Sequence, residues 1–263
     1  MKLKHAEKFL SLIALLLSIA LAAGCGGHAD APAVTTASPA DPPPPGSTTP
    51  SNAKVFSDVQ KLPGWESCTA CTGSAFAAFS MTQGVAAPSQ SGASARFQML
   101  PGTKPFGGAL WFKRLGSVDS ATHFVYDLYF YMENPSGPQA VEFNVTQSAG
   151  GSHYDFSTQC DLIDTRTWRV WDPVKKEWAG TSASCVQPPP NTWNHLVWEF
   201  ERNSSGQVVF SAVTLNGNRS AVNVTMPHTA DKRSGVDVAF QLDANQTATP
   251  FSVWLDKINL TYW

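Results

Sequence analysis

Between residues 95 and 262 the chain divides into short runs rich in Val, Thr, Phe, Tyr or Trp, with turn residues between them. Such runs are typical of β-strands. No stretch of this region shows a convincing apolar repeat at helical spacing, although residues 54–61 could form a short helix. The eleven expected strands are residues 95–100, 109–115, 122–133, 140–148, 152–160, 167–172, 192–202, 207–215, 220–226, 236–243 and 252–262.

About eleven strands without long helical crossovers must pair mainly antiparallel, which predicts an all-β fold of two packed sheets. Asn216-Gly217 predicts a tight hairpin, because this pair accepts the positive φ angles of a type I′ turn. In the run 122–133 the even-numbered side chains from Phe124 to Phe130 can fill the space between the sheets, and Tyr129 and Tyr131 then face outward. An outward face lined with Tyr suggests a groove.

The N-terminal 24 residues have the features of a secretory signal. Three Lys precede an apolar run at residues 9–23 that is too short for an ordinary membrane-spanning helix. The run ends in Leu-Ala-Ala-Gly-Cys25, which resembles the lipobox of bacterial lipoproteins, in which the Cys is lipidated and becomes the new N-terminus. The resemblance implies a protein anchored by lipid to the bacterial outer membrane or cell surface. The alternative is an ordinary signal peptide, with Cys25 unmodified.

The segment 25–52 is dominated by Ala, Pro, Thr, Ser and Gly, and it lacks the apolar side chains that would offset the entropy of folding. We therefore expect a disordered tether, followed by one domain at residues 53–263. Without the three Lys and the one Glu of the signal, 15 basic and 19 acidic side chains remain from the totals of 18 and 20. This mildly acidic balance argues against nucleic acid or anionic lipid headgroups as partners.

Four cysteines besides Cys25 fit a chain that leaves the cytosol. The pairing Cys68 with Cys71 and Cys160 with Cys185 is favoured, because the first two are too close in sequence to reach different elements easily. Alternatives for Cys68 and Cys71 are a redox pair or half of a zinc site. The surrounding residues are typical of a loop, whereas a redox motif should open a helix and a zinc site needs more Cys or His.

Two phrases resemble the concanavalin A-like jelly-roll superfamily. They are Asn-Thr-Trp-Asn-His-Leu-Val-Trp at residues 191–198 and Val-Trp-Leu-Asp-Lys-Ile-Asn-Leu at residues 253–260. That group contains laminin G-like domains, legume-type lectins, family 16 glycoside hydrolases and several polysaccharide lyases. The resemblance implies a two-sheet antiparallel jelly-roll sandwich over residues 55–263.

The run 140–148 contains the strongest candidate site. Glu142 and Asn144 are two residues apart and share one face of a strand. Together with Gln147 they resemble the Glu-x-Asp-x-x-Glu motif of family 16 hydrolases, in which a bulge brings the last residue to the same face. Glu142 would be the nucleophile, but Gln147 cannot donate a proton to a leaving oxygen, and a retaining glycosidase needs two carboxyl groups about 5 Å apart. The pattern favours hydrogen bonding to sugar hydroxyls. The alternative is a structural role for Glu142, paired with a nearby cation.

Lyase chemistry is a second catalytic hypothesis. Jelly-roll polysaccharide lyases use a Tyr or His base, with Gln, Asn or Arg neutralising a uronate, and the chain offers Gln147, His153, Tyr154 and Arg169. Their order matches no lyase signature. His195 follows a Trp on an expected core strand, which favours a hydrogen-bonded structural role.

Tryptophans supply the remaining evidence, because sugar rings stack on indole faces. Trp168, Trp171 and Trp178 fall within eleven residues, although any one of them could belong to the core. We expect no cofactor and no metal site, with a structural calcium ion at Asp161, Asp164 and Asp172 as the alternative.

Taken together, these patterns predict a surface lipoprotein that binds a polysaccharide or cell-wall glycan. A glycoside hydrolase or polysaccharide lyase of the same fold is the first alternative, and a structural or adhesive surface module is the second. The expected ligand-binding residues are Glu142, Asn144, Gln147, Tyr129, Tyr131, Trp168 and Trp171.

Overall fold

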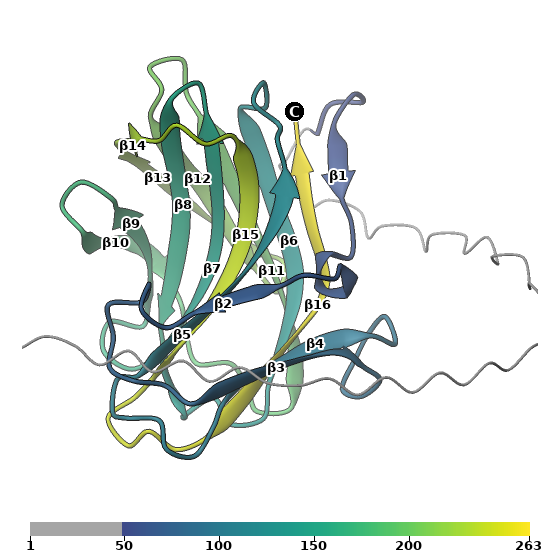
Figure 1. The fold of residues 1–263 in the computed structure, drawn as a ribbon, viewed down its shortest axis with the longest axis vertical. Coiled ribbons are helices and arrows are strands. Elements are labelled where there is room, and N and C mark those ends of the chain that lie inside the picture. The colour runs from purple at the N-terminus through teal and green to yellow at the C-terminus, as the bar shows by residue number, and fades with distance from the viewer. Residues whose placement is uncertain (1–48) are drawn as a thin grey trace, which may run out of the picture. The chain divides into compact units, whose positions relative to one another are not determined.

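Two antiparallel sheets of eight strands each form a sandwich within residues 49–263, the part of the chain that the computed structural model describes (Figure 1). The expected signal peptide, the lipidation site Cys25 and the tether as far as residue 48 lie outside the described residues. Within residues 49–263 no helix has the length and apolar character needed to cross a membrane.

Sheet A is ordered β13-β12-β11-β6-β16-β4-β3, and the short β1 pairs with β16. Its strands are β13 (Asn218–Met226), β12 (Val208–Leu215), β11 (Thr192–Arg202), β6 (His123–Met132), β16 (Phe251–Tyr262), β4 (Ser94–Met99), β3 (Phe79–Val85) and β1 (Lys54–Phe56). Sheet B is ordered β10-β9-β8-β7-β15-β5-β2, and β14 pairs with β8. Its strands are β10 (Glu177–Ser184), β9 (Thr167–Asp172), β8 (Ser152–Asp161), β7 (Pro138–Ala149), β15 (Gly235–Ala244), β5 (Gly108–Gly116), β2 (Glu66–Cys68) and β14 (Thr229–Ala230).

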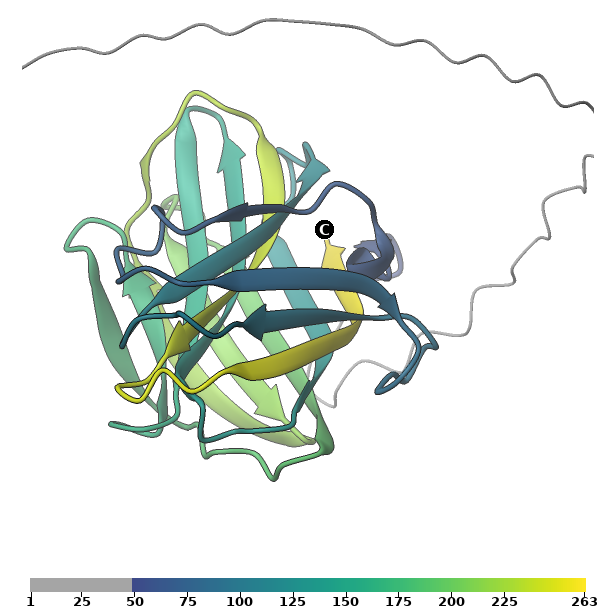
Figure 2. The same ribbon diagram turned by 60° about the horizontal axis from the view of Figure 1, so that its bottom comes forward.

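The chain passes repeatedly from one sheet to the other, between β4 and β5, β6 and β7, β10 and β11, and β15 and β16. As a result strands distant in sequence become neighbours, such as β6 between β11 and β16. Crossing connections of this kind, with antiparallel pairing throughout both sheets, characterise the jelly-roll sandwich. The predicted fold class is therefore confirmed. The two layers, with the yellow C-terminal strand β16 in one of them, can be followed from a second direction in Figure 2.

All eleven predicted strands are present, and the described residues contain five more: β1, β2, β3, β10 and β14. Most of these five are short or lie at a sheet edge, where a strand needs no continuous apolar face and its sequence pattern is weak. The helix expected at residues 54–61 is wrong for its first half, because Lys54–Phe56 pairs with the end of β16. Only one 3₁₀ turn, η1 (Val59–Lys61), follows.

The predicted alternation along β6 is confirmed. Phe124, Tyr126, Leu128 and Phe130 are buried in the core between the sheets, and Tyr129 and its alternate neighbours face outward. The hairpin between β12 and β13 is also confirmed, since both of its turn residues have positive φ, 50° at Asn216 and 80° at Gly217.

Both predicted disulfides are present. Cys68 at the end of β2 pairs with Cys71 in the following loop. Cys160 on β8 pairs with Cys185 just after β10, and both of these sulfurs are buried. The zinc alternative for the first pair has no support, because among residues 49–263 no group of three or more His, Cys, Asp or Glu could hold a metal ion. Cys68 ends a strand and does not open a helix, as the redox alternative required.

Replacing Cys68 and Cys71 together by Ser is expected to lower the free energy of unfolding by only about 2 kcal/mol. The bond spans a sequence separation of three, so it removes little entropy from the unfolded chain. Urea unfolding of the double variant beside the oxidised wild type measures the effect. A loss above about 4 kcal/mol would contradict the expectation.

Two of the three Asp residues considered for calcium, Asp161 and Asp172, accept hydrogen bonds from turns of their own chain. The Asp161 carboxylate accepts hydrogen bonds from the backbone N–H groups of Asp164 and Thr165, at 3.1 and 3.0 Å. The Asp172 carboxylate accepts from Val174 and from Lys175, both at 3.0 Å. These carboxylates therefore shape the loops on either side of β9.

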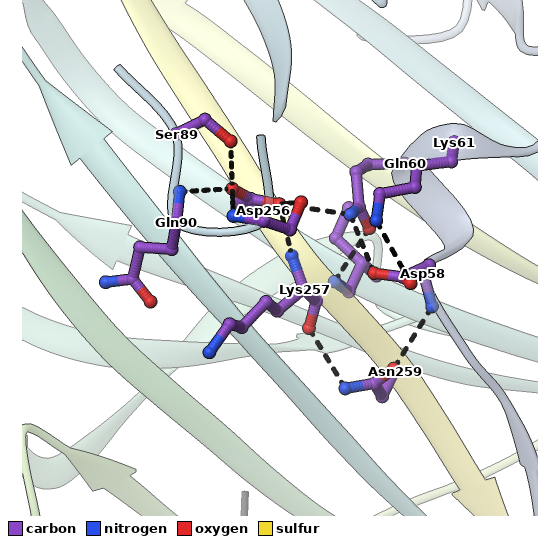
Figure 3. Close-up of polar contacts among 10 residues, drawn as sticks. Asp58, Gln60, Lys61, Ser89, Gln90, Asp256, Lys257 and Asn259 are labelled. Carbon is purple, nitrogen blue, oxygen red and sulfur yellow. Dashed lines mark hydrogen bonds and ion pairs between the residues drawn. The ribbon is translucent and has the colours of Figure 1, made fainter. Parts of the chain in front are cut away.

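A buried carboxylate fastens the loop between β3 and β4 to sheet A (Figure 3). Asp256 is fully buried on β16, next to a bulge in which Lys257 has a φ of 48°. One oxygen accepts from the Ser89 hydroxyl and the Gln90 N–H, both at 2.6 Å. The same oxygen accepts from the Ser91 N–H at 2.9 Å. The other oxygen accepts from the Ser91 hydroxyl at 2.6 Å, the Gln60 amide at 3.1 Å and the Lys257 N–H at 2.9 Å. Asp256 thus ties three chain segments together.

Candidate functional site

A cleft of about 290 Å³ opens on the outer face of sheet B. Its floor comes from the neighbouring strands β7, β8 and β15, one side from the β9–β10 hairpin, and the other from β5 and the loop after β2. The lining residues are Cys71, Thr72, Leu110, Glu142, Asn144, Thr146, Asp155, Ser157, Trp171, Trp178, Ala239 and Gln241. The cleft is of the size of a small-ligand site.

Glu142 lies on β7 at the end of the floor away from Asp155 and is only 4% exposed. Its Oε1 accepts hydrogen bonds from the amides of Gln159 and Gln241, at 2.9 and 3.0 Å. Its Oε2 accepts from the Asn144 amide at 3.2 Å, and the Asn144 oxygen accepts from the Thr158 N–H at 3.0 Å. The alternative interpretation, in which Glu142 pairs with a cation, is wrong, because these partners are amides from three adjacent strands.

A second carboxyl group lies beside Glu142. Gln241 donates to Glu142 and, at 3.0 Å, to Asp243, which lies two residues further along β15. Burial raises the pKa of Glu142 well above its usual value, and the charge of Asp243 raises it further. Burial also raises the pKa of Asp243 to about 6. The two side chains are hydrogen-bonded to each other, and carboxyl groups this close resist being ionised together.

Replacing Asp243 by Asn is expected to flatten the pH dependence of stability. A raised carboxyl pKa means that the folded protein binds the proton more tightly than the unfolded chain does, so stability falls as the pH rises from about 4 through about 6. Asn removes this titration. Urea unfolding at pH 4 and pH 7.5 measures the effect. The free energy of unfolding of the variant, relative to that of the wild type, should be about 1–2 kcal/mol higher at pH 7.5 than at pH 4. Asp164→Asn, in an exposed turn, is the control and should gain nothing.

Two tryptophans form one side of the cleft. Trp171 on β9 and Trp178 on β10 are directly opposite in the register of the hairpin, and their ring centroids are 5.1 Å apart at an interplanar angle of 61°. Each ring is partly exposed. The hairpin thus presents indole surface next to a polar floor.

Asp155 and Ser157 on β8 form the end of the floor nearest Thr146. The Ser157 hydroxyl and its N–H both donate to the same oxygen of Asp155, the N–H at 3.0 Å. Burial raises the pKa of Asp155. Both side chains keep some exposure, in contrast to Glu142 and Asn144, so they are the polar groups that a ligand meets first.

The structure divides the predicted ligand-binding residues among three places. Glu142, Asn144 and Trp171 line the cleft. Gln147 does not, because β7 pairs with β8 from residue 140 to residue 149 without a bulge and residue 147 stays on the core side. Its amide donates to the backbone oxygens of Val118 and Ala121, both at 3.0 Å.

Trp168 and the two predicted Tyr residues also lie elsewhere. Trp168 is buried in the core, where its ring packs edge-on against Trp198 with centroids 5.3 Å apart. Tyr129 and Tyr131 lie on the outer face of sheet A, the opposite side of the sandwich. There Tyr129 stacks on His195 at 4.4 Å. The expected single groove of Glu142 with these tyrosines is therefore wrong.

The residues proposed for a lyase do not meet. Tyr154 is buried, with the Arg202 guanidinium 4.8 Å from its ring centre. His153 shares a hydrogen bond with Ser148 at 3.0 Å, and although it lies only two residues before Asp155 on β8 it does not line the cleft. The Arg169 guanidinium donates to the Gln159 oxygen and lies 3.4 Å from Asp161. His195 lies on sheet A, with Nε2 2.7 Å from Asp127, which agrees with the expected structural role.

Several site residues were missed in the sequence, notably Asp155, Ser157, Gln241 and Asp243. Asp155 and Ser157 were visible as polar positions on the expected strand 152–160, and alternation places them on one face. Gln241 and Asp243 lie about a hundred residues beyond Glu142, and only the pairing of β15 with β7 brings them together.

Comparisons with known proteins place the chain among structures of similar strand arrangement. No protein-family model and no curated protein matches the sequence. Similar solved structures include the cellulose-induced protein Cip1, with 9% identity, 74% of this chain and 90% of that chain covered, and a TM-score of 0.47. Lectin I from Ulex europaeus, in complex with the methyl glycoside of α-L-fucose, has 12% identity, 81% and 98% coverage, and a TM-score of 0.48.

A prokaryotic β-1,3-1,4-glucanase (lichenase) derived from a mouse hindgut metagenome has 12% identity, 79% and 98% coverage, and a TM-score of 0.45. Lectins and a glucanase are thus among the similar structures, as the sequence resemblance implied. At 9–12% identity and TM-scores below 0.5, these likenesses carry no argument about what this chain binds.

Proposed function

We propose that the domain at residues 53–263 binds a glycan in the sheet B cleft. The observation that carries the proposal is the placement of the Trp171–Trp178 pair beside a floor of carboxyl, amide and hydroxyl groups. An indole face stacks on the apolar C–H surface of a sugar ring, while the floor can hydrogen-bond the ring hydroxyls. The cleft is open in the structure, which favours a ligand site over a purely adhesive surface.

The spacing of carboxyl groups supports binding over glycoside hydrolysis. Glu142 and Asp243 are hydrogen-bonded, which is closer than the roughly 5 Å between the two carboxyls of a retaining enzyme. The other lining carboxyl is Asp155, which pairs with Thr146, four residues along β7 from Glu142. The backbone positions of the two residues are therefore roughly 13 Å apart along the strand direction, a wide spacing for two carboxyl groups that must act on one glycosidic bond.

The lining of the cleft also gives no support to lyase chemistry. Among the residues that line it there is no His, Lys, Arg or Tyr, so the Tyr or His base of that mechanism does not face the cleft. Of the residues suggested for that role, Gln147 and Tyr154 are buried, while His153 and Arg169 contact Ser148 and Asp161 and do not line the cleft.

A polysaccharide panel tests the proposal. The purified domain should be retained by at least one plant, algal or microbial polysaccharide in affinity electrophoresis, and incubation should release neither reducing ends nor unsaturated products. Glu142→Gln, which keeps the size of the side chain and its acceptor oxygen, should retain binding. Binding to no polysaccharide would refute the function, and product release abolished by Glu142→Gln would show hydrolysis instead.

We also propose that the domain is displayed on the cell surface through a lipid on Cys25, on the strength of the lipobox resemblance and the Pro-rich segment after it. In a bacterial host, the wild-type chain should incorporate labelled palmitate and partition with membranes. Cys25→Ala should do neither. Equal labelling of both chains would contradict the proposal.

A further inference from the structure

The charges that face the cleft are all of one sign. Among the lining residues the ionisable side chains are Glu142 and Asp155, and none is a Lys, Arg or His. The other polar side chains of the lining are the hydroxyls and amides of Thr72, Asn144, Thr146, Ser157 and Gln241. A ligand in the cleft therefore meets carboxyl oxygens and neutral groups.

The basic side chains near this face are engaged by acids outside the cleft, and they include His153, two residues before Asp155 on β8, which lies 3.7 Å from Asp231. Arg169 lies 3.4 Å from Asp161 and donates to Gln159. Lys175, in the turn of the β9–β10 hairpin, lies 3.6 Å from Asp172 and 3.7 Å from Glu177. None of these cations lines the cleft. Neighbouring acids compensate these positive charges, which weakens the attraction of the cations for a negatively charged ligand.

The hydrogen-bonding capacity of the floor also favours neutral groups over anionic groups. Asp155 accepts both bonds of Ser157 on one oxygen, and Ser157 uses its hydroxyl proton in doing so. A sugar hydroxyl can donate to a carboxylate and accept from an amide, so it suits this surface. A uronate or sulfate group can only accept hydrogen bonds. Close to Asp155 and Glu142 it would lose its hydrating water without gaining a cationic partner.

We infer that the cleft selects uncharged glycans and rejects anionic ones, with Asp155 as the residue that determines this specificity. The inference rests on the proposed glycan binding, which it narrows to one class of ligand. The discrimination comes from a repulsive element in the cleft as much as from the attractive Trp surface. Asp155 acts directly, since it is the lining carboxylate with remaining exposure.

The test compares oligosaccharides of matched backbone. Isothermal titration at pH 7.5 and low salt would measure oligomers of glucose, mannose and galactose beside the oligomers of the corresponding uronic acids. The wild type should bind at least one neutral oligomer, and its uronic-acid counterpart at least tenfold more weakly. Asp155→Asn should strengthen uronate binding and so reduce the ratio of the uronate to the neutral dissociation constant at least threefold. Added salt should reduce the same ratio in the wild type.

Asp164→Asn serves as the matched control, because this exposed turn carboxylate does not line the cleft, and it should leave the ratio unchanged. Uronate binding as tight as neutral binding, or a ratio unaffected by Asp155→Asn, would overturn the inference and leave glycan binding intact. Binding to neither class would overturn the proposed function and the inference with it.

Discussion

Replacing Asp256 by Ala is expected to lower the free energy of unfolding by about 4 kcal/mol, one of the two largest effects we foresee for a single site. The carboxylate is fully buried and accepts six hydrogen bonds, from Gln60, from the loop at residues 89–91 and from the bulge of β16. Without it, several buried donors lose their partner at a cost of about 1–3 kcal/mol each, reduced where the loop can turn toward water.

Urea unfolding of the variant at pH 7 measures this effect, and Glu133→Gln, an exposed carboxylate outside the network, is the control that should change little. The pH dependence has a definite sign. Burial opposes ionisation of Asp256, but the bonds from Ser89, Ser91 and Gln90 outweigh it and lower its pKa. The contribution of the Asp256 carboxylate to stability is therefore complete above about pH 4 and is lost as the pH falls further. The free energies of unfolding of the wild type and the variant should converge at acid pH. A loss below about 1 kcal/mol would contradict the assignment.

Replacing Trp171 and Trp178 together by Ala is expected to weaken glycan binding roughly 100-fold, or about 2.7 kcal/mol. The pair supplies the stacking surface of the cleft, and its partly exposed rings take little part in the core. The free energy of unfolding should change much less than for a core tryptophan such as Trp168. Titration with whichever oligosaccharide the wild type binds would give the ratio of dissociation constants.

The outer face of sheet A offers the matched control. There Trp193 on β11 packs against Tyr131, with ring centroids 5.5 Å apart, and keeps some exposure. Trp193→Ala removes one partly exposed indole from the opposite side of the sandwich and should leave binding unchanged within about twofold. If Trp193→Ala abolished binding and the Trp171/Trp178 variant did not, the ligand would lie on sheet A.

The strand pattern was predictable because the two-residue period of a strand is a local property. It placed Phe124 and Leu128 in the core and Tyr129 outside it without knowledge of the neighbours. The same reasoning correctly put Glu142 and Asn144 on one face. It failed at Gln147 because a bulge was assumed there, and a bulge depends on the pairing of β7 with β8.

Sequence alone therefore determined eleven of the strands of residues 95–262, their inward and outward faces, the sandwich class and both disulfides. Only the tertiary structure decided which faces share a surface. It separated Tyr129 from Glu142 by placing β6 and β7 in different sheets, and it joined Gln241 and Asp243 to Glu142 by pairing β15 with β7. The physical reason is the sequence separation over which the determining contacts act. Side-chain alternation is fixed by the backbone geometry of neighbouring residues, whereas the order of strands in a sheet depends on contacts between residues far apart in the chain.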